Sequence, residues 1–101
     1  MTVFYEWDVE TVTATETDAH EEDEVMEHYH CSSYKEARAR AATKPDEGCK
    51  HEVALVRDDD EGRSWAYVED GVLPEFFSDA NGCNTAKVPQ RFVKEVVAAG
   101  R

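Results

Sequence analysis

Apolar and acidic side chains alternate along the start of the chain. Tyr5, Trp7 and Val9 fall on one side of an extended backbone, and Val3 continues the pattern. The intervening positions are all acidic: Glu6, Asp8 and Glu10. A period of two with aromatic and β-branched residues predicts a β-strand, here over residues 3–16, with one apolar and one acidic face.

The residues that follow predict a hairpin and then a helix. Residues 18–24 are expected to form a charged turn, and residues 25–31 are expected to return as the second strand. Residues 33–43 predict a helix, because Ser33 and Glu36 have the spacing of a capping box. In that motif two side chains bond free backbone N–H groups at the helix start.

The second half of the chain predicts more strands and a final helix. The expected strands cover residues 50–57, 63–69 and, as a short segment, 84–87, and the helix covers residues 89–99. The strand over 50–57 is apolar on both faces, which favours a central position in the sheet. Pro74 excludes a central strand at 72–78, where Phe76 and Phe77 are expected to fill the core.

The order of these elements is ββαββ, a possible further β, then α. We therefore expect one α+β domain over residues 1–101, with an antiparallel β-sheet of four to five strands and two helices packed on one face. Tyr5, Trp7, Trp65 and Tyr67 occupy alternate strand positions and are expected to form cross-strand core pairs.

Length and composition fit a folded chain. It has 101 residues, of which 41% are hydrophobic and 10% aromatic, and this is too apolar for a disordered acidic tail. No apolar run approaches the ~18 residues of a membrane span, and no secretion signal is visible. Three cysteines without paired spacing, Cys31, Cys49 and Cys83, favour a reducing compartment. A cytoplasmic protein that does not enter a membrane is expected.

The net charge of −12 is concentrated at one end of the chain. The first thirty residues carry ten carboxylates and no Lys or Arg. Residues 31–45 and 82–101, which contain the two expected helices, each carry four basic residues against one glutamate, a net +3. In a two-layer fold the helical side would then be weakly basic and the open side of the sheet strongly acidic.

An acidic sheet face is the main candidate for a binding site. Alternate residues on a strand are about 6.6–6.8 Å apart, so a row of carboxylates resembles the phosphates of a nucleic-acid strand in spacing. The candidate partner-binding residues are Glu6, Asp8, Glu10, Asp18, Glu21, Glu22, Asp23 and Glu24. Two plainer interpretations stay open, a polar face that is merely solvated and the acidic surface typical of a halophilic origin.

The histidines and cysteines offer a second interpretation. His28, His30, Cys49 and His51 form two pairs with i, i+2 spacing that could supply the four ligands of a zinc ion. The short spacing between cysteines that is typical of zinc sites is missing, so we expect no metal and no cofactor. The run from Asp58 to Gly62 lacks the ligand spacing of a calcium loop and is expected to be a solvated turn.

Motifs that would indicate catalysis are missing, since the chain has neither a glycine-rich phosphate loop nor a nucleophile elbow. The basic residues of 33–43 form a small patch within a field of −12, so direct nucleic-acid binding is not expected. The pattern gives no indication of oligomeric state. We expect a non-enzymatic binding module that engages a basic protein surface. Its concrete form would be a nucleic-acid mimic that occupies the DNA or RNA groove of a host complex.

In general profile the chain is similar in style to small proteins of phages and mobile elements that inhibit host nucleases, including anti-restriction and anti-CRISPR inhibitors. The likeness is one of size, acidity and fold class, and no specific motif carries it. The alternatives are a small zinc domain built on the His/Cys set and an ordinary solvated bacterial domain.

Overall fold

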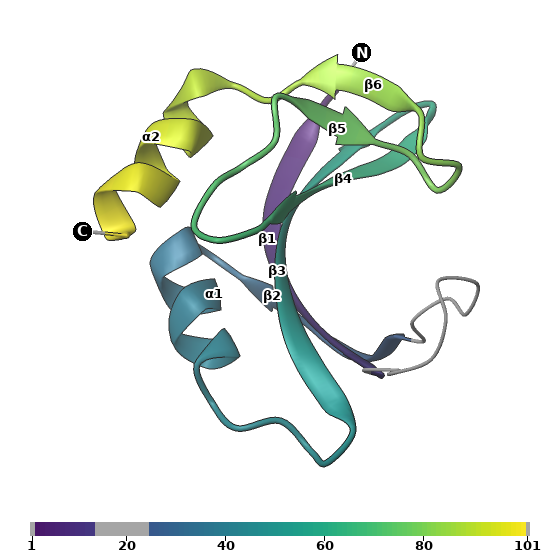
Figure 1. Ribbon diagram of the computed structural model, residues 1–101. Coiled ribbons are helices and arrows are strands. Elements are labelled where there is room, and N and C mark those ends of the chain that lie inside the picture. Colours follow the sequence, from purple (N-terminus) through teal and green to yellow (C-terminus); the bar gives the residue numbers. More distant parts are fainter. Residues whose placement is uncertain (1, 14–24, 101) are drawn as a thin grey trace.

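A computed structural model describes residues 2–13 and 25–100 of the chain (Figure 1). Its elements are β1 (Phe4–Thr13), β2 (Val25–Cys31), α1 (Tyr34–Ala41), β3 (Cys49–Asp59), β4 (Gly62–Val68), β5 (Phe76–Ser78), β6 (Asn84–Lys87) and α2 (Gln90–Ala99). The strands form a six-stranded antiparallel sheet in the order β2-β1-β3-β4-β5-β6. The predicted α+β class is confirmed. The expected turn at 18–24 lies outside the described residues.

The sheet has one strand more than the expected four to five, because a short segment after Pro74 joins it. In this segment, β5, Ser78 pairs with Trp65 of β4 and Phe76 pairs with Lys87 of β6. The long strands β1 and β3 pair from Phe4↔Asp58 to Thr13↔Cys49. Because β3 lies between β1 and β4, its central position agrees with its apolar composition.

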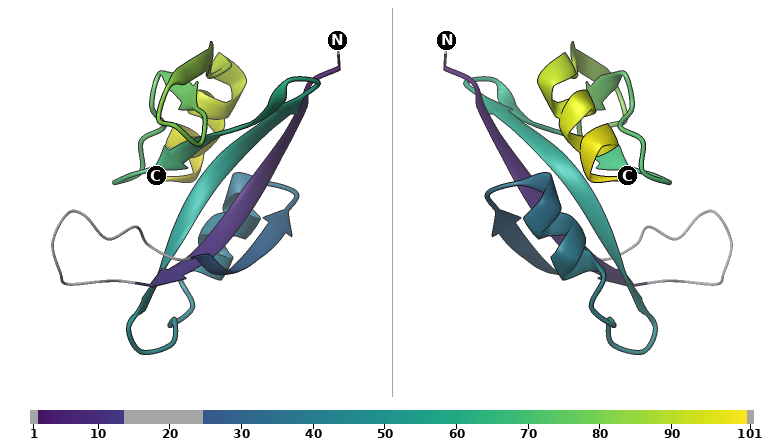
Figure 2. Two further views of the ribbon diagram at one scale, coloured as in Figure 1. Left: turned by 90° about the vertical axis from the view of Figure 1, so that its right-hand side faces the viewer. Right: turned by 90° about the vertical axis from the view of Figure 1, so that its left-hand side faces the viewer.

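Both helices lie on the same side of the sheet, and the sheet curves away from them (Figures 1 and 2). The Ser33 side chain caps α1 by accepting a hydrogen bond from the backbone N–H of Glu36 at 3.1 Å. The Glu36 carboxylate accepts from the N–H and O–H of Ser32 instead of from Ser33, so half of the predicted capping box forms. At α2, Pro89 is the N-cap residue and Gly100 the C-cap residue.

The hydrophobic core lies between the helices and one face of the sheet. Trp7 packs against Tyr34 of α1 with ring centroids 5.1 Å apart, and Tyr5 packs against Phe92 of α2 at 5.0 Å. The fully buried large side chains of this layer are Val9, Leu55, Phe77 and Val96. Burying each such side chain stabilises the fold by roughly 1.5–3 kcal/mol. We call this side of the sheet the helix-covered face.

The expected core role of four strand aromatics is correct for only two of them. Tyr5 and Trp7 belong to the helix-covered face. Trp65 and Tyr67 pair in register with Val56 and Ala54, which lie on the opposite side of the sheet from Leu55. The two pairs therefore point to different faces, and the sequence pattern alone does not give the register that separates them.

Among the described residues no helix is long and apolar enough to cross a membrane.

Candidate functional site

Even-numbered residues of β1 point to the side of the sheet that neither α1 nor α2 covers. The register pairs Asp8 with His30 of β2 and with Ala54 of β3, and it pairs Glu10 with His28 and Glu52. Directly paired residues share a face of the sheet. We call this side the open face. Its carboxylates from β1 and β3 are Glu6, Asp8, Glu10, Glu52 and Asp58.

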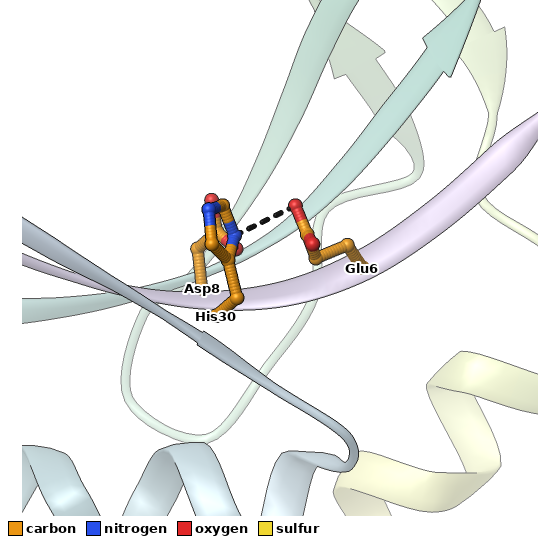
Figure 3. Close-up of side chains that lie close together, drawn as sticks. All are labelled: Glu6, Asp8 and His30. Atoms are coloured by element: carbon orange, nitrogen blue, oxygen red, sulfur yellow. Dashed lines mark hydrogen bonds and ion pairs between the residues drawn. The ribbon is translucent and has the colours of Figure 1, made fainter.

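Three side chains of the open face converge on one point (Figure 3). His30 Nδ1 lies 2.8 Å from Glu6 Oε2 and 2.9 Å from Asp8 Oδ1. Each residue offers one potential ligand atom, and all three atoms lie within 4.8 Å of one another. The two carboxylates come from one strand and the imidazole from its neighbour, so the pairing of β1 with β2 fixes the arrangement.

The carboxylate row forms, but most of it is not the exposed row that the alternation predicts. Asp8 is 3% exposed and Glu10 is 7% exposed, whereas the side chain of Glu6 keeps 41% of its surface. The reason is that β1 is an interior strand, whose side chains have neighbours on both sides. The interpretation of Asp8 and Glu10 as freely exposed contact residues is therefore wrong.

The buried end of the row has its own hydrogen bond. The Tyr67 hydroxyl donates to Glu10 Oε2 at 2.9 Å. Burial raises the pKa of Glu10, and the Tyr67 hydrogen bond opposes that shift in part. Burial, with the Glu10 carboxylate nearby, also raises the pKa of Tyr67 well above its usual range. The hydroxyl therefore keeps its proton and remains a donor.

The exposed end of the row favours positive charge. The hydrogen bond with Asp8 raises the pKa of His30, and the nearby Glu6 carboxylate adds to that effect. The rings of His28 and His30 lie side by side with centroids 5.3 Å apart. This part of the open face thus combines two carboxylates with the His30 imidazole, which can carry a proton or bind a cation.

A cleft opens next to Glu10. Its volume is about 720 Å³, and Glu10, Trp65, Tyr67 and Leu73 are among the residues that line it. Trp65 and Tyr67, which the alternation assigned to the core, line this cleft instead. Aromatic faces beside a carboxylate make a setting that suits a cationic group.

The four residues of the alternative zinc set, His28, His30, Cys49 and His51, do not form one site. His28 and His30 pair with Glu10 and Asp8 on the open face. Cys49 and His51 pair with Thr13 and Thr11, whose side chains lie on the helix-covered face, and His51 Nδ1 is 2.9 Å from Thr11 Oγ1. One pair of residues is therefore separated from the other by the sheet. Cys31, Cys49 and Cys83 are free thiols.

The aspartate turn uses its carboxylates for its own structure. Asp59 Oδ1 accepts hydrogen bonds from the backbone N–H of Glu61 and of Gly62 at 2.8 and 3.1 Å. Its other oxygen pairs with Arg57. These contacts lower the pKa of Asp59. The remaining candidate residues, Asp18, Glu21, Glu22, Asp23 and Glu24, lie outside the described part of the chain.

The sequence pattern identified each member of the converging group but not the group itself. It placed Glu6 and Asp8 on one strand face and His28 with His30 on another. The missing information is the offset between β1 and β2, which pairs Asp8 with His30. No known family model, curated protein or solved structure matches the chain, so its function has to be inferred from the site.

Proposed function

We propose that this protein is a non-enzymatic binding module whose open face engages a basic surface of another protein. The observation that carries the proposal is the gathering of carboxylates on the one sheet face that α1 and α2 leave uncovered. On β1 and β3 these carboxylates are Glu6, Asp8, Glu10, Glu52 and Asp58, and the Lys and Arg residues on the same face are Lys50 of β3 and Arg63 of β4.

Exposed and buried carboxylates have different parts in this proposal. Glu6, Glu52 and Asp58 have side chains exposed by 41%, 34% and 46%, so they can contact a partner directly. Asp8 and Glu10 are nearly inaccessible, and they add to the negative field from below the surface. Such a field raises the rate at which a basic partner associates, and the effect weakens as salt rises.

The cleft beside Glu10 supports the same proposal. Trp65 and Tyr67 present aromatic surface, and Glu10 supplies a carboxylate at the wall. An Arg or Lys side chain of a basic partner would find cation–π partners there, within the negative field of the buried Glu10 carboxylate. Charge alone would attract many basic proteins. The defined shape of the cleft would favour those that can place a side chain in it.

The more specific form of the proposal is nucleic-acid mimicry. Carboxylates fixed on neighbouring strands would occupy the basic groove of a nucleic-acid-binding complex, in the manner of phage or mobile-element inhibitors of host nucleases. What supports this form is the strand-fixed spacing of the carboxylates and the charge of −12. The partner would then release its counterions as it does on DNA or RNA.

A capture experiment with a matched charge control tests the proposal. The protein is immobilised and exposed to nuclease-treated bacterial lysate, and bound proteins are eluted with duplex DNA or with salt. We expect a nucleic-acid-binding protein that duplex DNA displaces. The variant Glu52→Lys/Asp58→Lys should lose it, because both substitutions lie on the open face.

The control is Asp46→Lys/Glu47→Lys, which changes the net charge equally in the exposed segment between α1 and β3. It should retain the captured protein. If both variants lose the captured protein equally, only net charge matters. If neither the variants nor duplex DNA affects capture, the open face is not the binding surface.

A further inference from the structure

We propose that Glu6, Asp8 and His30 form a binding site for a divalent first-row transition-metal ion. The inference does not depend on a protein partner. It rests on the convergence of two carboxylate oxygens and one imidazole nitrogen from adjacent strands (Figure 3). These residues differ from the His/Cys set suggested by sequence spacing, because only His30 belongs to both.

The two distances from the His30 nitrogen to the carboxylates fit a shared ion. In octahedral coordination with bonds of about 2.0–2.2 Å, neighbouring ligand atoms are separated by about 2.8–3.1 Å. His30 Nδ1 lies 2.8 Å from Glu6 Oε2 and 2.9 Å from Asp8 Oδ1. The Glu6 and Asp8 oxygens lie within 4.8 Å of each other, so one ion between the three atoms could bind all of them after side-chain rotation.

A single proton on His30 is a poor bridge to the two carboxylates. The Nδ1 atom of His30 carries at most one proton, yet it lies within hydrogen-bond distance of two carboxylates. One N–H could serve both carboxylates only as a shared, bifurcated donor, and Asp8 is 3% exposed. A buried carboxylate needs strong compensation for its lost hydration. A divalent ion compensates both carboxylates together.

The donor set indicates the class of ion. An imidazole nitrogen favours first-row transition ions over Mg²⁺ and Ca²⁺, whereas two carboxylates also suit the harder members such as Mn²⁺. Calcium takes six to eight oxygen ligands, which this site does not offer. The side chains of Glu6 and His30 are 41% and 53% exposed, so an ion can enter from solvent and keep water in its remaining positions.

Titration with Mn²⁺ alone, followed by the loss of the free-ion electron paramagnetic resonance signal, tests the site. Mn²⁺ is chosen because it binds thiols weakly, so the three free cysteines do not compete. We expect one tighter site above the weak binding of a highly acidic protein. His30→Gln should weaken that site by at least about tenfold, since even outer-shell changes cost 10–100-fold.

His28→Gln is the matched control, because His28 lies two residues away on the same face but outside the converging group. It should leave the affinity within about twofold. Glu6→Gln should weaken Mn²⁺ binding as His30→Gln does. Because the Glu6 side chain is exposed, this substitution should not unfold the protein, so weaker binding would report on the site itself. Circular dichroism checks that each variant is folded.

Two results would overturn the proposal. The first is Mn²⁺ binding that His30→Gln and Glu6→Gln leave unchanged, which would assign the ions to the general acidic field. The second is no binding tighter than that of the Glu6→Gln variant, which would identify the group as an imidazolium–carboxylate ion pair. Neither result depends on whether a protein partner is found, so this test and the capture experiment can fail separately.

Discussion

The helix-covered face and the open face of β1 are buried to a similar extent by different chemistry. Trp7 and Val9 are 3% and 0% exposed beneath the helices, and Asp8 and Glu10 are 3% and 7% exposed on the opposite side. On the first face apolar side chains contact one another. On the second, carboxylates contact a histidine and a tyrosine.

The two faces therefore differ in how they affect stability. Apolar burial is favourable by itself, whereas a buried carboxylate must recover its lost hydration from specific partners. An interior strand that carries carboxylates gives up stability that apolar residues could have supplied. Under the proposed function, the open face serves binding and the helix-covered face serves folding.

The largest expected effect comes from the helix-covered face. Phe77 is 0% exposed and its neighbour Phe76 is 38% exposed, so they form a matched pair. Phe77→Ala should lower the free energy of unfolding by about 3–5 kcal/mol. Phe76→Ala should lower it by less than about 1.5 kcal/mol, the low end of the range for a fully buried side chain. Urea denaturation measures both, and equal losses would contradict the assignment of Phe77 alone to the core.

A smaller effect is expected where the open face buries its hydrogen bond. Tyr67→Phe removes the donor to Glu10 and should lower the free energy of unfolding by about 1.5–3 kcal/mol, as for bonds to charged groups. Tyr29→Phe is the control, because Tyr29 donates to Glu27 at 3.3 Å in an exposed setting. Its cost should stay within about 0.5 kcal/mol. Indistinguishable costs would mean that the Glu10 site is solvated.

The smallest effect on stability is expected from the exposed carboxylates of the open face. Glu52 and Asp58 form ion pairs with Lys50 and Arg63 at 3.5 and 3.3 Å. Such surface pairs contribute about 0–1 kcal/mol. Glu52→Lys/Asp58→Lys should therefore melt within a few degrees of the original protein. A large loss would show that these side chains serve folding, and it would disqualify the variant as a probe of binding.

The sequence predicted the elements better than their faces. Alternation at Tyr5, Trp7 and Val9 was sufficient for β1, and Ser33 with Glu36 located the start of α1. The exposure of Asp8 and Glu10 was predicted wrongly, because alternation shows that a face is polar but not that it is solvated. That property depends on which strands lie on either side.

The convergence of Glu6, Asp8 and His30 could not be predicted from the sequence, for a related reason. Its formation requires Asp8 to lie opposite His30, and a shift of the register by one residue would move His30 to the other face. The number of residues between β1 and β2 in the sequence does not determine this offset. Trp65 and Trp7 likewise lie on opposite faces of the sheet because of the strand register, which local alternation does not reveal.

The most direct test of the account is the rate at which the captured partner associates with the protein at low and at physiological salt. We predict that the association rate falls steeply as salt rises, because the attraction between exposed charges is screened beyond ~8 Å at physiological ionic strength. Glu52→Lys/Asp58→Lys should lower both the rate and its dependence on salt, while Asp46→Lys/Glu47→Lys should change them much less. Equal changes in the two variants, or a rate insensitive to salt, would contradict the claim that the open face is the binding surface.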